Sequence, residues 1–157
     1  MSVRGELICF VFFFCFLMIG RPPRSTLFPY TTLFRSLGDN LIENNIASAV
    51  ADFQAQGQGA KILLKEVDDP QRFGVAQVEE GKVLRITEKP SDPVSRLAVI
   101  GIYMYDGRVW EIIDTLQPSD RGELEITDVN NWYIDDGSLS YDVMTGWWTD
   151  AGTFASL

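Results

Sequence analysis

The chain has little positive charge. Its 157 residues include 13 lysines and arginines against 22 acidic residues, which gives a formal net charge of −9. A surface that binds nucleic acid needs basic side chains to neutralise phosphates, so this composition argues against nucleic acid as a partner. Cysteine is also scarce: the two cysteines, Cys9 and Cys15, lie near the N-terminus. Residues 37–157 therefore have no disulfide framework, which fits a reducing, cytoplasmic home.

The first 36 residues differ in kind from the rest. They hold four basic residues and one acidic residue, whereas residues 37–157 hold nine basic and 21 acidic residues. An apolar run from Leu7 to Ile19 has the length of the apolar region of a signal peptide and is too short to span a membrane. The run is crowded with phenylalanine, and no cleavage pattern of small residues follows it. A signal peptide is therefore a poor explanation.

Residues 18–36 match a different kind of sequence. They read "MIGRPPRSTLFPYTTLFRS", which differs only at Gly20 from the first-frame translation of a common sequencing-library adapter. Segments of this kind are set aside before a fold is inferred. We therefore interpret residues 1–36 as an artefactual, non-native segment and expect the genuine protein to begin at about Leu37.

The remaining residues alternate helical and extended patterns, as α/β domains do. In residues 42–57, Ile46, Val50 and Phe53 share one helical face, and Gly57 is expected to end the helix. A hairpin is expected around Glu80-Gly81. The further predicted helices cover 108–116 and 125–137, and the predicted strands cover 60–67, 74–80, 82–90, 97–106 and 139–144.

Two acidic residues stand at the ends of predicted strands. Asp39 in "LGDN" lies at an edge where α/β folds place ligands, although an aspartate there also serves to cap the following helix. Asp150 in "WWTDAGT" ends an apolar stretch and precedes small residues, and its alternative is a solvated loop position. If the two strands are neighbours, the carboxylates form a hard oxygen site suited to Mg²⁺.

Two further motifs contain charged residues suited to anions and hydroxyls. Glu88 and Lys89 in "ITEKPSDP" face opposite ways on an extended chain, so a ligand that touches both must lie at the strand's end. A carboxylate suits sugar hydroxyls and an ammonium suits phosphate, but a surface turn is the simpler interpretation. Arg121 in "RGELEITD" belongs either to an ordinary capped helix or to an anion site. The aromatic residues Tyr103, Tyr105, Trp147 and Trp148 fit a core better than a ligand stack.

The order of these motifs is more specific than any one of them. "LGDN", "RFGVAQV", "ITEKP", "AVIGIYMYD", "RGELEITDVNNWYIDDG" and "WWTDAGT" follow one another in the chain. In this order, residues 37–157 resemble the sugar-nucleotide nucleotidyltransferases, most closely the glucose-1-phosphate thymidylyltransferases. The resemblance implies a partial catalytic domain of the α/β class, with a mixed, mainly parallel sheet flanked by helices in an incomplete Rossmann-like fold. It also implies transfer of a nucleotidyl group from a nucleoside triphosphate, with dTTP as the first candidate, to a sugar 1-phosphate such as glucose 1-phosphate.

The resemblance assigns roles to the residues that match the family's motifs. It implies that Asp39 and Asp150 are catalytic and hold Mg²⁺, that Glu88 binds sugar hydroxyls, that Lys89 and Arg121 bind the sugar phosphate, and that the Gly74 backbone lines the sugar pocket. Gln77 departs from the family, where relatives often have glutamate. Thymidylyl, uridylyl and cytidylyl transfer share these motifs in part, so the base stays open.

The segment before "LGDN" lacks the Gly-rich triphosphate loop that the resemblance implies. We therefore expect the 157-residue chain itself to be inactive and its strands at 60–67 and 97–106 to expose unpaired edges. The alternatives are a non-catalytic regulatory or sugar-phosphate-binding module of the same fold and, if the apolar N-terminus is taken literally, a secreted or membrane-anchored protein. The expected partners are the two substrates, without nucleic acid or membrane, and a homo-oligomer is left open.

Overall fold

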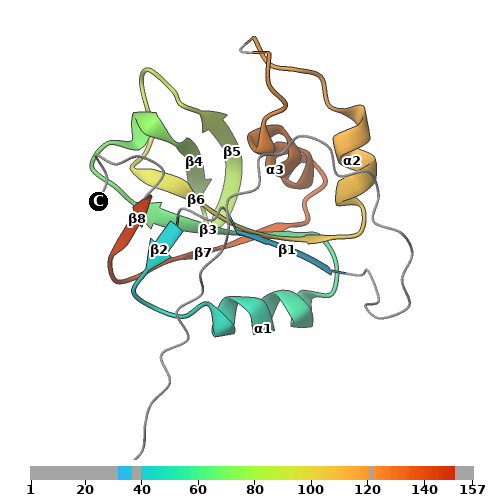
Figure 1. Ribbon diagram of the computed structural model, residues 1–157, viewed down its shortest axis with the longest axis horizontal. Helices are drawn as coiled ribbons and strands as arrows, with labels where there is room; N and C mark the ends of the chain where they lie inside the picture. The colour runs from blue at the N-terminus through green and yellow to red at the C-terminus, as the bar shows by residue number, and fades with distance from the viewer. Residues whose placement is uncertain (1–31, 37–39, 121, 151–157) are drawn as a thin grey trace, which may run out of the picture.

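The computed structural model describes residues 32–36, 40–120 and 122–150, with side chains from Asn40 onward. Figure 1 shows a sheet with α1 on one side and α2 and α3 on the other. The elements are β1 (Thr32–Ser36), β2 (Asn40–Ile42), α1 (Ala47–Gln56), β3 (Ala60–Glu66), a single 3-10 turn (Pro70–Arg72), β4 (Gly74–Glu79), β5 (Lys82–Glu88), β6 (Leu97–Asp106), α2 (Val109–Thr115), α3 (Ile126–Asp135), β7 (Leu139–Val143) and β8 (Trp148–Asp150).

The main sheet has the strand order β5-β4-β6-β3-β7, and β1 lies beside β6. β2 and β8 form a separate antiparallel pair. The predicted mixed sheet flanked by helices is confirmed. The expected excess of parallel pairs is not found among the described strands, because only β3 and β7 run parallel while the β3–β6, β4–β5, β4–β6 and β1–β6 pairs are antiparallel. The tight β4–β5 connection accounts for one of these pairs, since a hairpin can join only antiparallel strands.

The expectation that β3 and β6 expose unpaired edges is wrong. β3 lies between β6 and β7. β6 pairs with β3 on one side, and on the other with β4 at Ala98 and with β1 from Ile102 to Asp106. The strand at 32–36 thus occupies the edge of β6 that the sequence argument left open, although these residues match the translated adapter.

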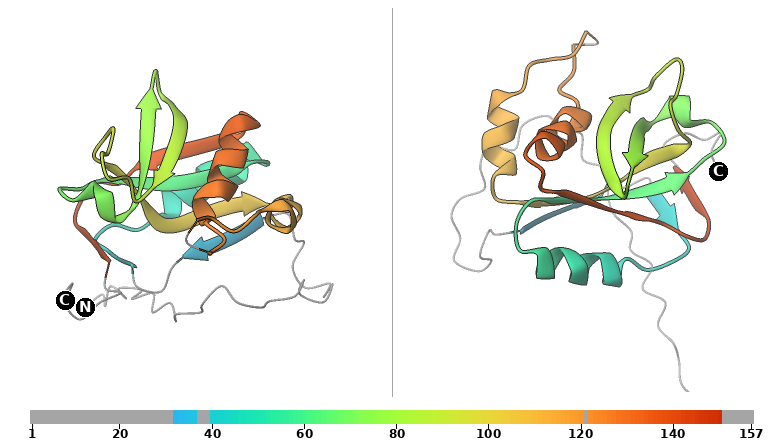
Figure 2. Two further views of the ribbon diagram at one scale, coloured as in Figure 1. Left: turned by 90° about the horizontal axis from the view of Figure 1, so that it is seen from above. Right: turned by 180° about the vertical axis from the view of Figure 1, so that it is seen from behind.

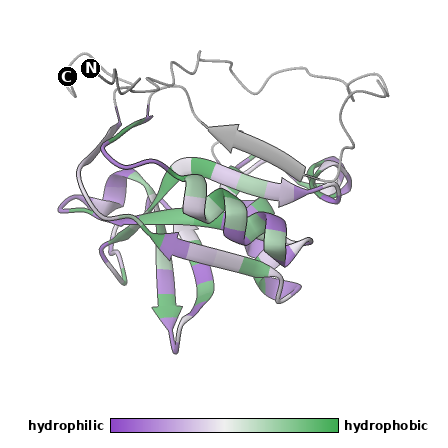
Figure 3. Cartoon of the chain, turned by 90° about the horizontal axis from the view of Figure 1, so that it is seen from below, coloured by the Kyte–Doolittle hydropathy of each residue, from purple (hydrophilic) through white to green (hydrophobic). Residues whose placement is uncertain are grey.

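Side chains of β6 alternate between two apolar clusters, one on each face of the sheet. Ile100, Ile102 and Met104 pack with Ala49 and Phe53 of α1. Figure 3 shows α1 lying across this face. On the opposite face, Tyr103 and Tyr105 pack with side chains of α2 and α3, among them Val109, Ile112, Val129 and Tyr133. Burial on both faces explains why "LAVIGIYMYD" is almost continuously apolar.

The β4–β5 hairpin brings the end of β5 next to α3. Glu80 and Gly81 have φ angles of 48° and 74°, the left-handed pair that a two-residue hairpin turn requires. Figure 2 shows the hairpin rising from the main sheet beside α3. α3 contacts β5 closely, and this contact positions Glu88 in the candidate site described below. No helix within the described ranges is both long enough and apolar enough to cross a lipid bilayer.

Candidate functional site

A cavity of about 230 Å³ opens where β4, β5, β6, α3 and β8 meet. Four of the predicted site residues line it, namely Gly74, Glu88, Lys89 and Asp150. They come from three separate stretches of the sequence, which the fold brings to one cavity. Asp39 and Arg121 lie outside the described residues, and their roles stay predictions.

Gly74 allows two side chains to approach the backbone of β4. A Cβ atom added to Gly74 would lie 3.3 Å from both Glu88 Oε2 and Thr127 Oγ1, which is tighter than most real Cβ contacts. Gly74 also faces Glu88 across the hairpin as its register partner. A larger residue at position 74 would therefore displace the Glu88 carboxylate or the Thr127 hydroxyl.

Lys89 turns out of the strand immediately after Glu88. Its φ of 41° lies in the left-handed region that residues other than glycine seldom adopt. Its backbone N–H donates a hydrogen bond to the Phe73 carbonyl at 3.0 Å. Lys89 Nζ lies 4.0 Å from Glu88 Oε1. The two charged groups thus meet at the end of β5, where the sequence argument required a shared ligand to lie.

Tyr103 and Trp148, which the sequence analysis assigned to a core, line the cavity together with Phe73. Phe73 and Trp148 meet edge to face, with ring centroids 5.2 Å apart and planes at 69°. Tyr103 also lines the cavity while being 4% exposed. The core assignment is correct for Tyr105, at 1% exposed, and wrong for Trp147, which is 55% exposed.

Asp150 is the last residue of β8 and lines the cavity. Its register partner in β2 is Asn40, the residue that follows Asp39 in the sequence. Trp148 Nε1 donates a hydrogen bond to Asn40 Oδ1 at 2.7 Å, which ties the two short strands together. β2, which begins at Asn40, is therefore the neighbour of β8, which ends at Asp150.

The described donors suit one kind of magnesium site. No group of three or more histidine, cysteine, aspartate or glutamate side chains in the described residues is placed to hold a metal ion. Mg²⁺ commonly uses one or two carboxylates and completes its shell with substrate phosphates and water. Asp150 lines an open cavity, which suits a Mg²⁺ ion shared with substrate phosphates and water. It does not suit an ion whose ligands all come from the protein.

Arg72 is a cationic residue that the motif analysis missed. It lines the 230 Å³ cavity and also an adjoining one of about 350 Å³, together with Phe73, Trp148 and Asp150. Its Nη1 lies 3.0 Å from Asp69 Oδ2 in an exposed ion pair. Thr127 was missed as well, although it stands within the quoted "RGELEITD". Neither residue has a sequence signal of its own, because only the tertiary fold brings it to the cavity.

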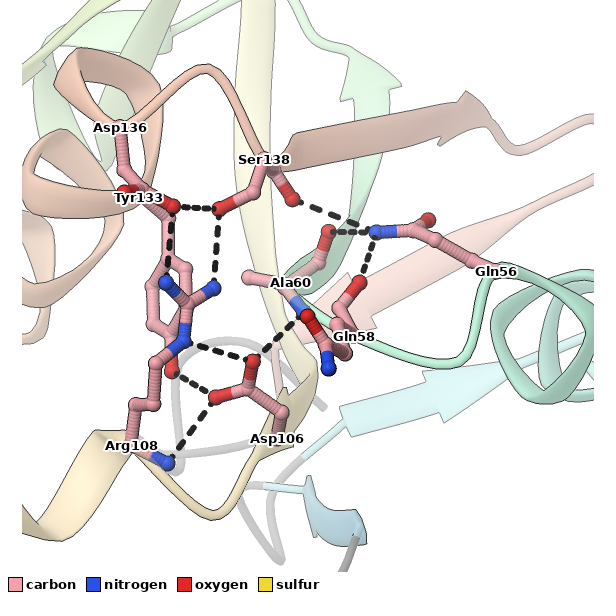
Figure 4. A network of polar contacts seen from close by, with 9 residues as sticks. Gln56, Gln58, Ala60, Asp106, Arg108, Tyr133, Asp136 and Ser138 are labelled. Atoms are coloured by element: carbon pink, nitrogen blue, oxygen red, sulfur yellow. Dashed lines mark hydrogen bonds and ion pairs between the residues drawn. The ribbon is translucent and has the colours of Figure 1, made fainter.

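A second polar cluster lies at the other end of β6 (Figure 4). Asp106 accepts hydrogen bonds from Gly59 N–H at 2.7 Å, Tyr133 Oη at 2.8 Å and Arg108 Nε at 2.9 Å. Burial disfavours the charged carboxylate, but these hydrogen bonds outweigh it and lower the pKa of Asp106. Burial and the bond to Asp106 raise the pKa of Tyr133. This cluster joins β3, β6 and α3 and is separate from the cavity.

The fold is an α/β domain with a mixed sheet, and comparison with known proteins gives its family. Residues 30–157 match the family profile described as nucleotidyl transferase. The chain belongs to this family. It is 43% identical over 125 residues to a glucose-1-phosphate thymidylyltransferase of Xanthomonas campestris, covering 77% of this chain and 42% of that protein. It is 42% identical over 118 residues to the low-salt glycan biosynthesis nucleotidyltransferase Agl11 of Haloferax volcanii, covering 74% of this chain and 33% of that protein.

Solved structures share the fold. A protein from Bacillus anthracis named as a glucose-1-phosphate thymidylyltransferase, crystallised with sucrose, is 52% identical and superimposes with a TM-score of 0.76 over 82% of this chain and 52% of that one. A UDP-glucose pyrophosphorylase in complex with UDP-glucose shares the fold at 23% identity, with a TM-score of 0.72 over 83% of this chain and 54% of that one. The chain spans less than half the length of the curated relatives described above.

Proposed function

We propose that this chain carries the sugar-1-phosphate-binding part of an enzyme that makes a nucleotide sugar. In the proposed reaction, a phosphate oxygen of glucose 1-phosphate attacks the α-phosphorus of a nucleoside triphosphate, with dTTP as the first candidate. The new P–O bond forms as the bond to pyrophosphate breaks, and the products are an NDP-glucose and pyrophosphate. The names of the relatives support the choice of sugar and base.

The observation that carries this proposal is the convergence of Glu88, Lys89 and Gly74 on one cavity with Asp150. A carboxylate and an ammonium 4.0 Å apart offer an acceptor for sugar hydroxyls beside a positive charge for phosphate. The aromatic rings of Phe73 and Trp148 supply an apolar surface beside them. This combination of groups suits a sugar phosphate better than it suits a free sugar or a simple anion.

The proposal assigns Asp150, together with Asp39, to Mg²⁺. The neighbouring β2 and β8 strands support that pairing. When bound there, the ion would neutralise negative charge on the phosphates. Lys89 and Arg121 hold the sugar phosphate in this proposal, and Glu88 orients the sugar. The segment that begins at about Leu37 is taken as the genuine protein, acting in the cytoplasm.

Titration of the isotopically labelled 157-residue chain with glucose 1-phosphate tests the binding part of the proposal. We expect amide shifts at Gly74, Glu88 and Lys89, and weaker effects from glucose or inorganic phosphate alone. Lys89→Gln should weaken glucose 1-phosphate binding about tenfold, because a hydrogen bond to a charged group is lost. Lys82→Gln, which changes an exposed lysine at the other end of β5, is the matched control and should leave binding unchanged. Wild-type chain that shows no shifts at these residues would refute the proposal.

The same chain should release no pyrophosphate from glucose 1-phosphate and any nucleoside triphosphate above a no-protein control. Positioning and charge stabilisation of the phosphates dominate this class of reaction, and no triphosphate loop occurs in this sequence. Binding without turnover would not separate this proposal from a non-catalytic sugar-phosphate-binding module. Turnover by a full-length protein carrying this segment would separate the two, because a non-catalytic module would show no turnover.

A further inference from the structure

The Glu88 carboxylate is held by a helix that lies far from it in the sequence. Thr127 Oγ1, in the first turn of α3, donates a hydrogen bond to Glu88 Oε2 at 2.6 Å. The Glu88 side chain is 24% exposed, while Thr127 is 5% exposed and is therefore shielded from water. A hydroxyl has one proton to donate, and in Thr127 that proton is committed to Glu88. Oε2 thus faces α3, and Oε1 lies on the side of Lys89.

One turn further along α3, Asn131 holds the backbone of the same strand. The Ile86 N–H donates to Asn131 Oδ1 at 2.9 Å, and Asn131 Nδ2 donates to the Ile86 carbonyl, also at 2.9 Å. β5 is an edge strand of the main sheet, so its outer backbone groups have no neighbouring strand there within the described residues. The Asn131 side chain supplies the two hydrogen bonds that such a strand would have given.

Thr127 and Asn131 are four residues apart and therefore lie on one face of the helix. Two other α3 residues fix the helix to the centre of the sheet. Tyr105 Oη donates to Asn130 Oδ1 at 2.7 Å, and Tyr133 Oη donates to Asp106 Oδ1 at 2.8 Å. α3 is thus bound to β6 by one set of polar contacts and to β5 by another. Through these contacts the buried centre of the sheet sets the position of the Glu88 carboxylate.

We propose that Thr127 and Asn131 are positioning residues for sugar recognition, with Thr127 fixing the rotation of the Glu88 carboxylate and Asn131 fixing the strand that carries it. Glu88 then presents Oε1 to a hydroxyl of the sugar 1-phosphate. The proposal rests on the function proposed above. A glutamate side chain has several rotatable bonds, and holding it in one arrangement before binding spares the ligand that ordering cost.

The test compares variants of the 157-residue chain that keep or remove the two contacts. Thr127→Val removes the hydroxyl at nearly constant shape, and Thr127→Ser keeps it. Thr115→Val is the matched control, because Thr115 Oγ1 also donates a short hydrogen bond, to the Ile112 carbonyl at 2.7 Å, but within α2 and away from the cavity. Each variant is titrated with glucose 1-phosphate and, separately, with inorganic phosphate.

We expect Thr127→Val to weaken glucose 1-phosphate binding about tenfold while phosphate binding changes less than about twofold, because only the sugar contact depends on Glu88. Thr127→Ser and Thr115→Val should both stay close to wild type. An equal loss for the two ligands would show a merely structural role and overturn the proposal. Unchanged glucose 1-phosphate binding in Thr127→Val would overturn it as well.

A measurement without ligand separates this inference from the proposed function. Three-bond coupling constants report whether the Glu88 side chain occupies one rotamer, which we expect in wild type and Thr127→Ser, with averaging in Thr127→Val. Asn131→Leu should speed hydrogen exchange of the Ile86 amide at least tenfold, since its acceptor is gone. If the wild-type chain fails to bind glucose 1-phosphate, the proposed function is wrong. The coupling constants still show in that case whether Thr127 fixes the Glu88 side chain. A single Glu88 rotamer in Thr127→Val would reject that role.

Discussion

Asn40 and Asp150 are register partners in a short antiparallel sheet formed by β2 and β8. Asp150 faces the cavity that also contains Glu88 and Lys89. The pairing places Asn40, the residue after Asp39 in the sequence, beside Asp150. The proposal that both aspartates hold one Mg²⁺ draws on this pairing.

In a full-length protein carrying this segment, Asp150→Asn and Asp39→Asn should each lower kcat by about 100-fold or more. Loss of one preorganised charge-stabilising group has an effect of this size. The double variant should lose less than the product of the two single effects, because both residues act through one ion. Steady-state kinetics at saturating Mg²⁺ measures kcat for all three variants. Near-wild-type turnover in either single variant would show that its residue does not hold the metal.

Glu88→Gln should act differently in the same full-length protein. Its proposed contact with a sugar hydroxyl exists before and during transfer, so the change should mainly raise KM for the sugar 1-phosphate and leave kcat nearly unchanged. Glu79→Gln, on the neighbouring strand of the hairpin and outside the cavity, is the control. A fall in kcat at constant KM would instead place Glu88 in the chemical step.

Stability should fall in acid because of Asp106. Its pKa is lowered in the folded state, so its contribution is fully present above the unfolded value of about 3.9 and is lost as the pH falls through the folded-state pKa. Asp106→Asn should lower the free energy of unfolding at pH 7 by about 2 kcal/mol or more, since the Arg108 guanidinium and three further donors lose a charged acceptor.

Denaturant unfolding of wild type and Asp106→Asn between pH 7 and pH 2.5 checks this expectation. The difference between the two proteins should shrink as the pH falls below 4. Asp136→Asn, which removes the exposed partner of the same arginine, should have a smaller effect. A difference that does not change with pH would contradict the role given to the Asp106 charge.

The local elements were predictable because each depends on a short-range pattern. The strand over 97–106 has the predicted limits, and α1 ends where Gly57 adopts a φ of 78° and its N–H caps the Phe53 carbonyl. The pairing of strands was not predictable in the same way, since it depends on contacts between distant segments. The contact from Thr127 to Glu88 likewise exists only because α3 and the hairpin pack together.

The interpretation of residues 18–36 as translated adapter leads to a prediction about DNA. Resequencing the source gene across the codons for Ser36 and Leu37 should give a different sequence upstream of Leu37 and the same sequence downstream. β1 shows that residues 32–36 pair with β6, but a strand edge accepts many extended sequences through its backbone. An unaltered upstream sequence in independent genomic DNA would show the interpretation to be wrong.

The most direct test of the central claim is a crystal structure of the chain grown with glucose 1-phosphate. We expect the sugar in the 230 Å³ cavity, with a hydroxyl within hydrogen-bonding distance of Glu88 Oε1 and the phosphate beside Lys89 Nζ. Ligand density in the adjoining cavity near Lys65 and Asp68 would contradict the proposed binding site. A cavity beside Glu88 that shows no ligand density at saturating glucose 1-phosphate would contradict it as well.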